Sequence, residues 1–328
     1  MARKEKSTTR QLRRKGSKKP RLAIIGAGRL GMTLGRALSD LGYPVGVVIS
    51  EHESSARRAA RQMGAGNRWL TAAQLIQPGP PQHKLLAESE LFLIATPDDA
   101  IPRASKRLAA ILSSSQFTKK RVALHVSGAI SSSVLQPLAS AGFATGSLHP
   151  LVSVSDPSSG SEIFRQVFFC VEGGPAATRA ARSIVRDLGG KSFTIDPKSK
   201  ALYHAAAVMA SGHAVALFDI AAEMLSRCGL SRRKAQEALL PLMQSAVQNL
   251  SQKDSSLALT GPFPRGDVFT IRNHLEAIRS PQLRQALEAY LVLGDRSVSL
   301  AKEGNSDSPR LDLVAQILSE HARLFMKR

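Results

Sequence analysis

A glycine-rich segment near the start of the chain has the residue types and spacing that bind phosphate groups. Gly26, Gly28 and Gly31 form a GxGxxG pattern between an apolar run, residues 21–25, and a helical pattern that continues to Leu41. In this setting the first glycine permits a tight turn, the second lets backbone approach a pyrophosphate, and the third allows close helix packing. Amide groups at the helix N-terminus then hold the anion. We expect NADP or NAD to bind the loop formed by Gly26, Ala27, Gly28, Arg29, Leu30 and Gly31.

The end of the second apolar run, residues 44–50, leaves the choice between the two dinucleotides open. Glu51 lies twenty positions after Gly31, where a carboxylate accepts hydrogen bonds from the ribose 2′-hydroxyl of NAD. Ser50, together with Arg57 and Arg58 about two helical turns later, could instead hold the 2′-phosphate of NADP, with Glu51 facing water. Both interpretations stay open from the sequence.

Polar residues follow three further apolar runs, each of which has the length of a buried strand. They are Thr96 and Pro97 after residues 91–95, Ser127 after residues 122–126, and His149 after residues 144–148. Because the carboxyl ends of parallel strands meet at one edge of a sheet, these side chains can reach the same crevice. We therefore expect Thr96, Pro97 and Ser127 to contact the cofactor, and His149 to contact the substrate.

Two candidate proton donors and one candidate anion clamp come later in the chain. Lys200 and His204 are four positions apart, so they share one face of an apolar helix, and either could protonate or polarise a carbonyl or imine. Alternatively, both residues have only structural roles, in which the lysine caps the domain junction and the histidine fills a polar gap. Arg265, in the rigid segment 259–267, could clamp an anionic substrate or simply pair with Asp267.

The elements that must position these residues change in kind along the chain. Up to residue 197, strands and helices alternate, which indicates a Rossmann-like, doubly wound, mostly parallel sheet. The expected strands are residues 21–25, 44–50, 91–95, 122–126, 144–148, 167–171 and 192–195. Helices are expected after Gly28 and at residues 54–64, 101–112 and 175–188. Residues 77–82 are expected to form a loop. From residue 198 only helical patterns follow, at 198–228, 232–251, 281–303 and 309–326. We predict a basic tail over 1–20, a dinucleotide-binding domain over 21–197 and an all-α substrate and dimerisation domain over 198–328.

The first predicted helix of the second domain is apolar nearly all round, and such a helix must be buried on every side. Either a bundle within the chain or a second copy of it could provide the cover. The same stretch is no convincing membrane span, because His204, Ser211, Gly212 and His213 interrupt residues 201–217.

The formal net charge of +20 is concentrated partly in the tail, because residues 1–21 hold ten Lys or Arg and one Glu. A segment with so few apolar residues should be disordered, and it either solubilises the chain or makes weak contacts with nucleic acid. The two cysteines lie far apart without Cys/His ligand spacing, so neither a disulfide framework nor a metal site is expected. We expect a cytoplasmic protein, because the first apolar run is a strand and glycine turn rather than a secretory signal.

The order of the motifs GAGRLG, ATPDDAI, HVSGA, GSLHPL, KALYHAAAVMASG and LTGPFPRGD resembles a bacterial family from residue 21 to about residue 300. In that family a Rossmann-like domain precedes a helical domain of unknown function, number 2520, and its members are provisionally described as NADP oxidoreductases. It is distantly similar to 6-phosphogluconate dehydrogenase, pyrroline-5-carboxylate reductase and ketopantoate reductase. The resemblance implies a cofactor in a cleft between the domains and a homodimer formed through the helices.

Three positions depart from the pattern of these relatives. The chain has Ser50-Glu51 where relatives often have Ser-Arg, and Ser211-Gly212 where they commonly have Ser-Asn. Lys200 and His204 replace the Lys-x-x-x-Asn pair of the β-hydroxyacid dehydrogenases. We predict an NAD(P)-dependent oxidoreductase that moves a hydride between nicotinamide and a small carbonyl or imine compound. The alternative is a sensor or scaffold that binds a dinucleotide without turnover.

Overall fold

The computed structural model of the chain describes residues 18–76, 78–113, 120–157, 160–304 and 308–326. Contacts divide the chain into two compact units, residues 1–207 and 208–328. The division falls ten residues after the predicted boundary, because residues 200–204 pack against the sheet of the first unit. Most of the predicted basic tail, residues 1–17, lies outside the described residues.

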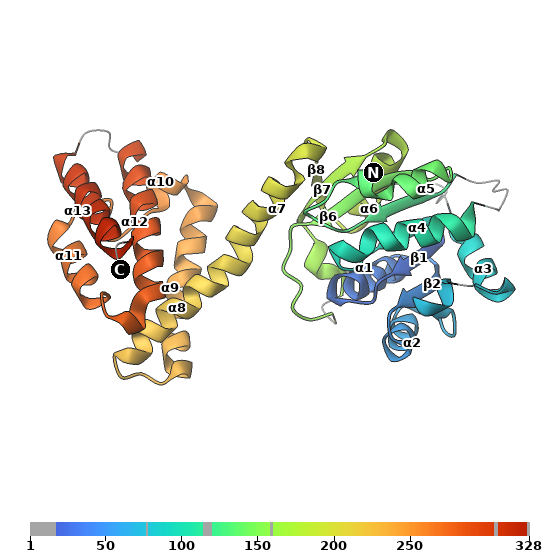
Figure 1. Ribbon diagram of the computed structural model, residues 1–328, viewed down its shortest axis with the longest axis horizontal. Helices are drawn as coiled ribbons and strands as arrows, with labels where there is room; N and C mark the ends of the chain where they lie inside the picture. The colour runs from blue at the N-terminus through green and yellow to red at the C-terminus, as the bar shows by residue number, and fades with distance from the viewer. Residues whose placement is uncertain (1–17, 77, 114–119, 158–159, 305–307, 327–328) are drawn as a thin grey trace, which may run out of the picture. The chain divides into compact units, whose positions relative to one another are not determined.

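The first unit is built on one eight-stranded sheet (Figure 1). Its strands are β1 (Leu22–Ile25), β2 (Val45–Ser50), β3 (Trp69–Thr71), β4 (Leu91–Ile94), β5 (Val122–His125), β6 (Ala144–Pro150), β7 (Phe168–Gly173) and β8 (Lys191–Phe193). The spatial order is β3-β2-β1-β4-β5-β6-β7-β8, and every pairing is parallel except that of β6 with β7. Strand order reverses between β1 and β4, and at such a point a doubly wound sheet opens a crevice for ligands.

Helices cover both faces of this sheet because its strands are apolar on both sides. On β1, Leu22 and Ile24 face one core while Ala23 and Ile25 face the other, as the alternation of side chains along a strand requires. The first core packs against α1 (Arg29–Asp40), α2 (Glu53–Gln62) and α6 (Pro175–Asp187). The second packs against α3 (Pro80–Ala87), α4 (Ile101–Leu112) and α5 (Gln136–Ser140). The prediction of a Rossmann-like, mostly parallel sheet is confirmed.

Three short elements differ from the sequence prediction. Strand β3 and helix α5 were not anticipated, because three and five residues carry too little periodicity to stand out. The predicted loop 77–82 is partly wrong, since α3 begins inside it at Pro80. A proline costs little in the first turn of a helix, where the amide it lacks has no helical partner.

The start of the described chain is tied to the amino-terminal side of the sheet. Lys19 Nζ lies 2.5 Å from Asp187 Oδ2, and the Tyr43 hydroxyl donates to the same oxygen at 2.5 Å. Lys19 also lies over the Tyr43 ring, 4.8 Å from its centroid. The Lys19 and Tyr43 hydrogen bonds lower the pKa of Asp187 against the opposing effect of its burial. This lysine, aspartate and tyrosine cluster fixes the chain just before β1.

The second unit is helical, as predicted, with its own apolar core. Its helices are α8 (Ala214–Arg227), α9 (Arg232–Gln252), α10 (Ser255–Ala258), α11 (Val268–Ala277), α12 (Arg284–Gly304) and α13 (Pro309–Met326). Ile271, Leu275, Leu291, Val314 and Leu318 are among the residues that fill the core. Helices α10 and α11, which lie on either side of the rigid segment 259–267, are not among the helices predicted from the sequence.

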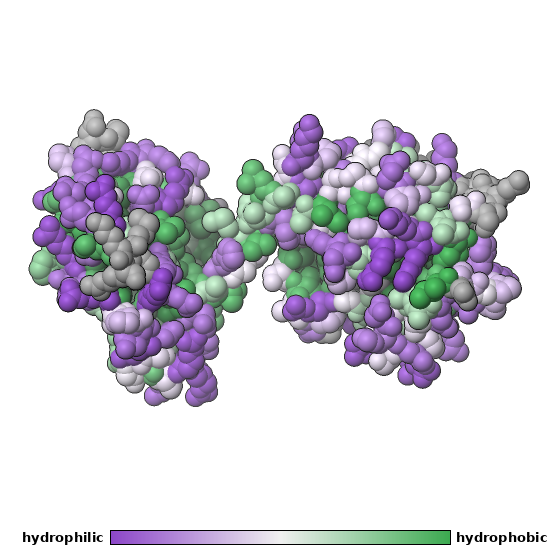
Figure 2. Space-filling model, in the orientation of Figure 1, coloured by the Kyte–Doolittle hydropathy of each residue, from purple (hydrophilic) through white to green (hydrophobic). Residues whose placement is uncertain are grey.

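Of the two covers expected for the first helix of the second region, a bundle within the described residues of the chain is not found, because much of this helix is exposed. It runs as α7 (Lys200–Val208), a π-helical turn (Met209–His213) and α8. Leu202, Met209 and Val215 are 75%, 66% and 69% exposed, and Figure 2 shows apolar residues at the surface where Figure 1 draws α7. Among the described residues, Pro197–Arg227 is also the one helix long and apolar enough to cross a membrane, by length and composition alone.

Candidate dinucleotide and substrate site

The three motif glycines have different structural reasons to be glycine. Gly26 has a φ of +105°, and a Cβ there would lie 2.5 Å from the carbonyl of Ala95. A Cβ on Gly31 would lie 2.2 Å from the Gly26 oxygen. A Cβ on Gly28, by contrast, would meet nothing within 4 Å. The fold itself therefore requires Gly26 and Gly31, whereas Gly28 leaves open space above the loop.

Helix α1 begins in this loop with its N-terminal amides uncapped by any side chain. Gly28 is the N-cap residue, its backbone is extended, and the first turn of α1 contains no acidic residue. Such an end attracts anions through its amide groups and the helix dipole. Arg29, the first residue of the helix, is exposed and adds a positive charge.

Two clefts meet at Gly28 and Arg29, which line both. The edge cleft, about 430 Å³, follows the carboxyl ends of β1, β4, β5 and β6, and is lined by Thr96, Pro97, Ser127, Gly128, His149 and His204 among others. The loop cleft, about 490 Å³, lies beside α1 and is lined by Ala27, Met32, Arg58, Gln62, Asp156 and Pro157. The structure thus brings together Gly28, Arg29, Leu30, Thr96, Pro97, Ser127, His149 and His204 around one opening.

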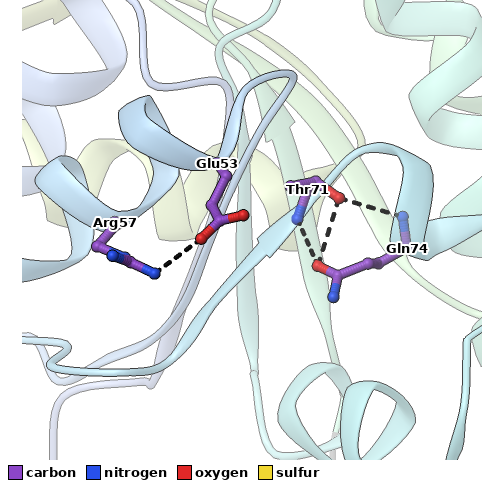
Figure 3. A network of polar contacts seen from close by, with 4 residues as sticks. All are labelled: Glu53, Arg57, Thr71 and Gln74. Atoms are coloured by element: carbon purple, nitrogen blue, oxygen red, sulfur yellow. Dashed lines mark hydrogen bonds and ion pairs between the residues drawn. The ribbon is translucent and has the colours of Figure 1, made fainter.

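The residues considered for cofactor discrimination lie at the end of β2 and on α2. Ser50 is half-buried and Glu51 is exposed. Arg57 donates to Glu53 at 2.7 Å, one turn back on α2, and this pair is drawn beside the Thr71–Gln74 turn in Figure 3. Its guanidinium also lies 5.3 Å from the centroid of the Trp69 ring. Arg57 is therefore held by its neighbours, and Arg58 is the α2 arginine that lines the loop cleft.

Three aromatic side chains meet where α7 approaches the end of β6. His149 Nδ1 lies 2.7 Å from the Tyr203 hydroxyl, and the His149 and His204 rings stand edge to face with centroids 5.5 Å apart. Gly128 allows this approach, because a Cβ there would lie 2.5 Å from His204 Nδ1 and 2.8 Å from His149 Nε2. In the described part of the chain, the buried atoms His204 Nδ1 and Thr96 Oγ1 have no hydrogen-bond partner. Both residues line the edge cleft.

Lys200 lies in the interior behind this wall and does not line the edge cleft. It is 1% exposed, and its Nζ donates to the Ser127 carbonyl at 3.1 Å and to Ser147 Oγ at 3.3 Å. Ser147 Oγ in turn donates to Glu172 at 3.2 Å, and this buried carboxylate also accepts from the amide and hydroxyl of Ser132. The structure therefore assigns Lys200 to the support of the strand ends rather than to direct contact with a ligand.

Burial and the lysine charge keep the neighbouring histidines neutral. Burial, followed by the Lys200 charge, lowers the pKa of His125 to about 3 and that of His149 to about 4. Burial also lowers the pKa of Lys200, against the opposing influence of Cys170 and Glu172. At neutral pH His149 therefore presents an uncharged imidazole to the edge cleft.

Sequence reasoning missed three residues of this arrangement. Tyr203 stood one position from a chosen histidine, but its contact with His149 spans 54 residues and leaves no local signal. Gly128 was read only as part of a strand end, and its closeness to two imidazoles needs the fold. Glu172 did leave a signal, because it is a lone charge in the otherwise uncharged strand β7, FFCVEG.

Arg265 belongs to the helical unit. Its side chain is exposed and lines a surface concavity with Arg310 and Asp267. Asp267 caps α11 by accepting from the Thr270 amide at 3.1 Å and from the Thr270 hydroxyl at 2.8 Å. These hydrogen bonds lower the pKa of Asp267 and account for its place in the segment.

The sequence matches two family descriptions, one for each part of the chain. Residues 5–150 match the Rossmann-like domain, and residues 167–297 match the domain of unknown function DUF2520. Each match covers less than half of the chain, and the two follow one another without overlap. The DUF2520 match begins one residue before β7 and ends inside α12, so it covers β7 and β8 as well as helices of the second unit, but not α13.

Solved structures with both regions share the fold. The BF3122 protein of Bacteroides fragilis, provisionally assigned as an NADP oxidoreductase, is 22% identical, with a TM-score of 0.66 over 85% of this chain and 98% of that one. Protein TM1727 of Thermotoga maritima is 23% identical, with a TM-score of 0.64 over 86% and 99%. A pyrroline carboxylate reductase of Plasmodium falciparum, solved with NADP bound, is 11% identical, with a TM-score of 0.53 over 93% and 99%. No curated protein matches the chain.

Proposed function

We propose that the protein is an NAD(P)-dependent oxidoreductase that transfers a hydride between nicotinamide and a small carbonyl or imine compound. The observation that carries this proposal is Gly28. It is a motif glycine that internal packing does not require, and it stands at an uncapped helix N-terminus between two clefts. A pyrophosphate above this residue would accept hydrogen bonds from the first amides of α1. The shared fold with a reductase that binds NADP supports the same proposal.

The two clefts suit the two halves of a dinucleotide. The loop cleft, with Arg29 and Arg58, would hold the adenosine half, whose phosphates are anionic. The edge cleft would hold the nicotinamide half beside Thr96, Pro97 and Ser127. When bound, the dinucleotide supplies or accepts the hydride, and the protein's part is orientation and the handling of a proton.

The polar atoms around the edge cleft would act on the substrate. Reduction of a carbonyl or imine adds a hydride to carbon and a proton to oxygen or nitrogen, so the protein must place a donor near that heteroatom. His204 lines the cleft and can provide it, His149 lines the same cleft and can donate a hydrogen bond to that heteroatom, and buried Lys200 keeps the strand ends in place. A substrate oxygen or nitrogen would also satisfy His204 Nδ1 or Thr96 Oγ1, which the protein leaves unpaired.

The substitution Gly28→Asp tests dinucleotide binding. A carboxylate there would occupy the open space above α1 and repel the pyrophosphate, while the absence of atoms within 4 Å of its Cβ should let the protein fold. We expect calorimetric titration with NADH and with NADPH to show binding to the wild type and none to Gly28→Asp. Gly174→Asp is the matched control, because Gly174 is also an exposed N-cap glycine with extended backbone, at the start of α6. Equal titrations of the wild type and Gly28→Asp would overturn the proposal.

Turnover is tested separately from binding. We expect a screen of carbonyl and imine compounds, followed by nicotinamide absorbance, to find oxidation of the bound cofactor by at least one compound. Tight binding of NADPH or NADH without turnover in any member of the screen would favour the dinucleotide sensor instead.

A further inference from the structure

Tyr203 and His149 form a hydrogen-bonded pair in which the position of one proton has a functional consequence. The Tyr203 hydroxyl lies 2.7 Å from His149 Nδ1, and the two rings stand at 89° with centroids 5.6 Å apart. Phe193 also packs against the Tyr203 ring, with ring centroids 5.9 Å apart. The phenol is therefore held in place from β8 and β6, and the imidazole cannot turn without breaking this bond.

Both rings are neutral at neutral pH. Burial raises the pKa of the Tyr203 phenol and lowers that of His149 to about 4. A neutral imidazole has one protonated nitrogen and one acceptor nitrogen, so the bond has two possible directions. Either the phenol donates to Nδ1 and the ring proton is on Nε2, or Nδ1 carries the proton and donates to the phenol.

The relative strengths of the donors and acceptors decide between the two directions. A phenol is a stronger hydrogen-bond donor than the N–H of a neutral imidazole, and the unprotonated nitrogen of an imidazole is a stronger acceptor than a phenol oxygen. The phenol therefore donates its proton to His149 Nδ1. The remaining imidazole proton is then on Nε2.

The Nε2 edge of His149 faces Gly128 in the wall of the edge cleft. A Cβ on Gly128 would lie 2.8 Å from both Nε2 and Cε1 of His149, and both residues line the cleft. Since the glycine has no side chain, no Cβ fills the space beside the Nε2–H group. The Lys200 ammonium lies 5.6 Å from the Tyr203 ring centroid, and its charge opposes a second proton on His149.

We infer that Tyr203 is a positioning residue that holds His149 as the neutral Nε2–H tautomer, so that the imidazole presents a hydrogen-bond donor to the edge cleft. The inference rests on the proposed function and specifies its ligand: the group beside His149 must offer a lone pair, as a carbonyl oxygen or an imine nitrogen does. A neutral imidazole can polarise such a group without being an acid itself. A protonated amine would meet a donor instead of an acceptor and would be disfavoured there.

Nitrogen NMR of the whole protein labelled with ¹⁵N-histidine tests this inference without any ligand. The His149 signals are assigned by their loss in His149→Asn. We expect a pyrrole-type Nε2 and a pyridine-type Nδ1 whose shift shows an accepted hydrogen bond. In Tyr203→Phe, which keeps the ring that packs on Phe193, the Nδ1 signal should move to the value of a nitrogen without that bond.

The chain contains a matched control in its helical unit. His274 Nδ1 lies 2.9 Å from the Tyr290 hydroxyl, with the rings at 89°. Tyr290→Phe should move the His274 signals and leave those of His149 unchanged. A protonated Nδ1 on His149 in the wild type, or an Nδ1 shift unaffected by Tyr203→Phe, would overturn the inference. Titration with NADPH reports on the proposed function independently, because Tyr203 is not among the residues that line either cleft.

Discussion

Acid should destabilise the sheet unit through two buried histidines. In the folded protein the pKa values of His125 and His149 are about 3 and about 4, whereas an unfolded chain binds these protons near the ordinary histidine value of about 6.5. Between these values the unfolded state carries more protons, so the free energy of unfolding falls as the pH is lowered. From about pH 7.5 to about pH 5, each histidine removes about 2 kcal/mol of stability, or about 4 kcal/mol together.

The one tryptophan of the chain makes this loss measurable for the sheet unit alone. Trp69 lies in β3, so its fluorescence during guanidinium unfolding follows the first unit whether or not the helical unit unfolds with it. Unfolding curves at a series of pH values give the dependence of stability on pH. Other acidic groups titrate in the same range, and a comparison of variants at each pH removes their contribution.

His125→Asn and His149→Asn isolate the two contributions. An asparagine oxygen can take the place of Nδ1, which accepts from the Ser127 amide in His125 and pairs with the Tyr203 hydroxyl in His149. Each variant should lose about 2 kcal/mol less than the wild type between these pH values. His52→Asn, at an exposed position, is the control and should follow the wild type. Parallel curves for all four proteins would refute the assignment of acid sensitivity to these buried rings.

Two further predictions concern the buried lysine and the exposed helix. Lys200→Met should cost about 3–5 kcal/mol at neutral pH, because it removes the buried positive charge that acts on the Glu172 carboxylate and reaches it through Ser147. The same fluorescence assay measures this loss. Addition of Glu172→Gln should restore part of it, and the absence of that recovery would contradict the coupling. We also propose that the exposed apolar surface of α7 and α8 is covered in a homodimer. Light scattering should then give about twice the chain mass of 35.1 kDa. Met209→Glu should shift the measured mass toward that of the monomer. A monomeric wild type would exclude that dimer.

The parts of the fold that sequence predicted well are those whose signal is local. The first two strands, the glycine turn and α4 are strongly patterned, and α4 begins and ends at the predicted residues Ile101 and Leu112. The boundary of the first unit was placed too early for a physical reason. The residues that fix it, Lys200 and Tyr203, read as the start of a helix, and only their contacts with β5 and β6 attach them to the sheet.

The residues of the candidate site were also predictable only in part. Gly28, Ser127 and His149 could be proposed because parallel strands bring their carboxyl ends together, which is a property of topology alone. The positions of Lys200 and Glu172 could not, because burial and a shared hydrogen bond to Ser147 determine them across 25 residues or more of chain. A helix face shared by Lys200 and His204 was a sound expectation, yet only one of the two side chains lines the cleft.

The lysine, aspartate and tyrosine cluster before β1 has a practical consequence. Because Lys19 is fixed beside the amino end of β1, the described chain enters the sheet at the edge opposite Gly28. An affinity handle or a linker to a sensor chip joined at this point of the chain would lie at the edge away from the proposed cofactor loop. Ligand measurements through such a linker would therefore leave Gly28 free.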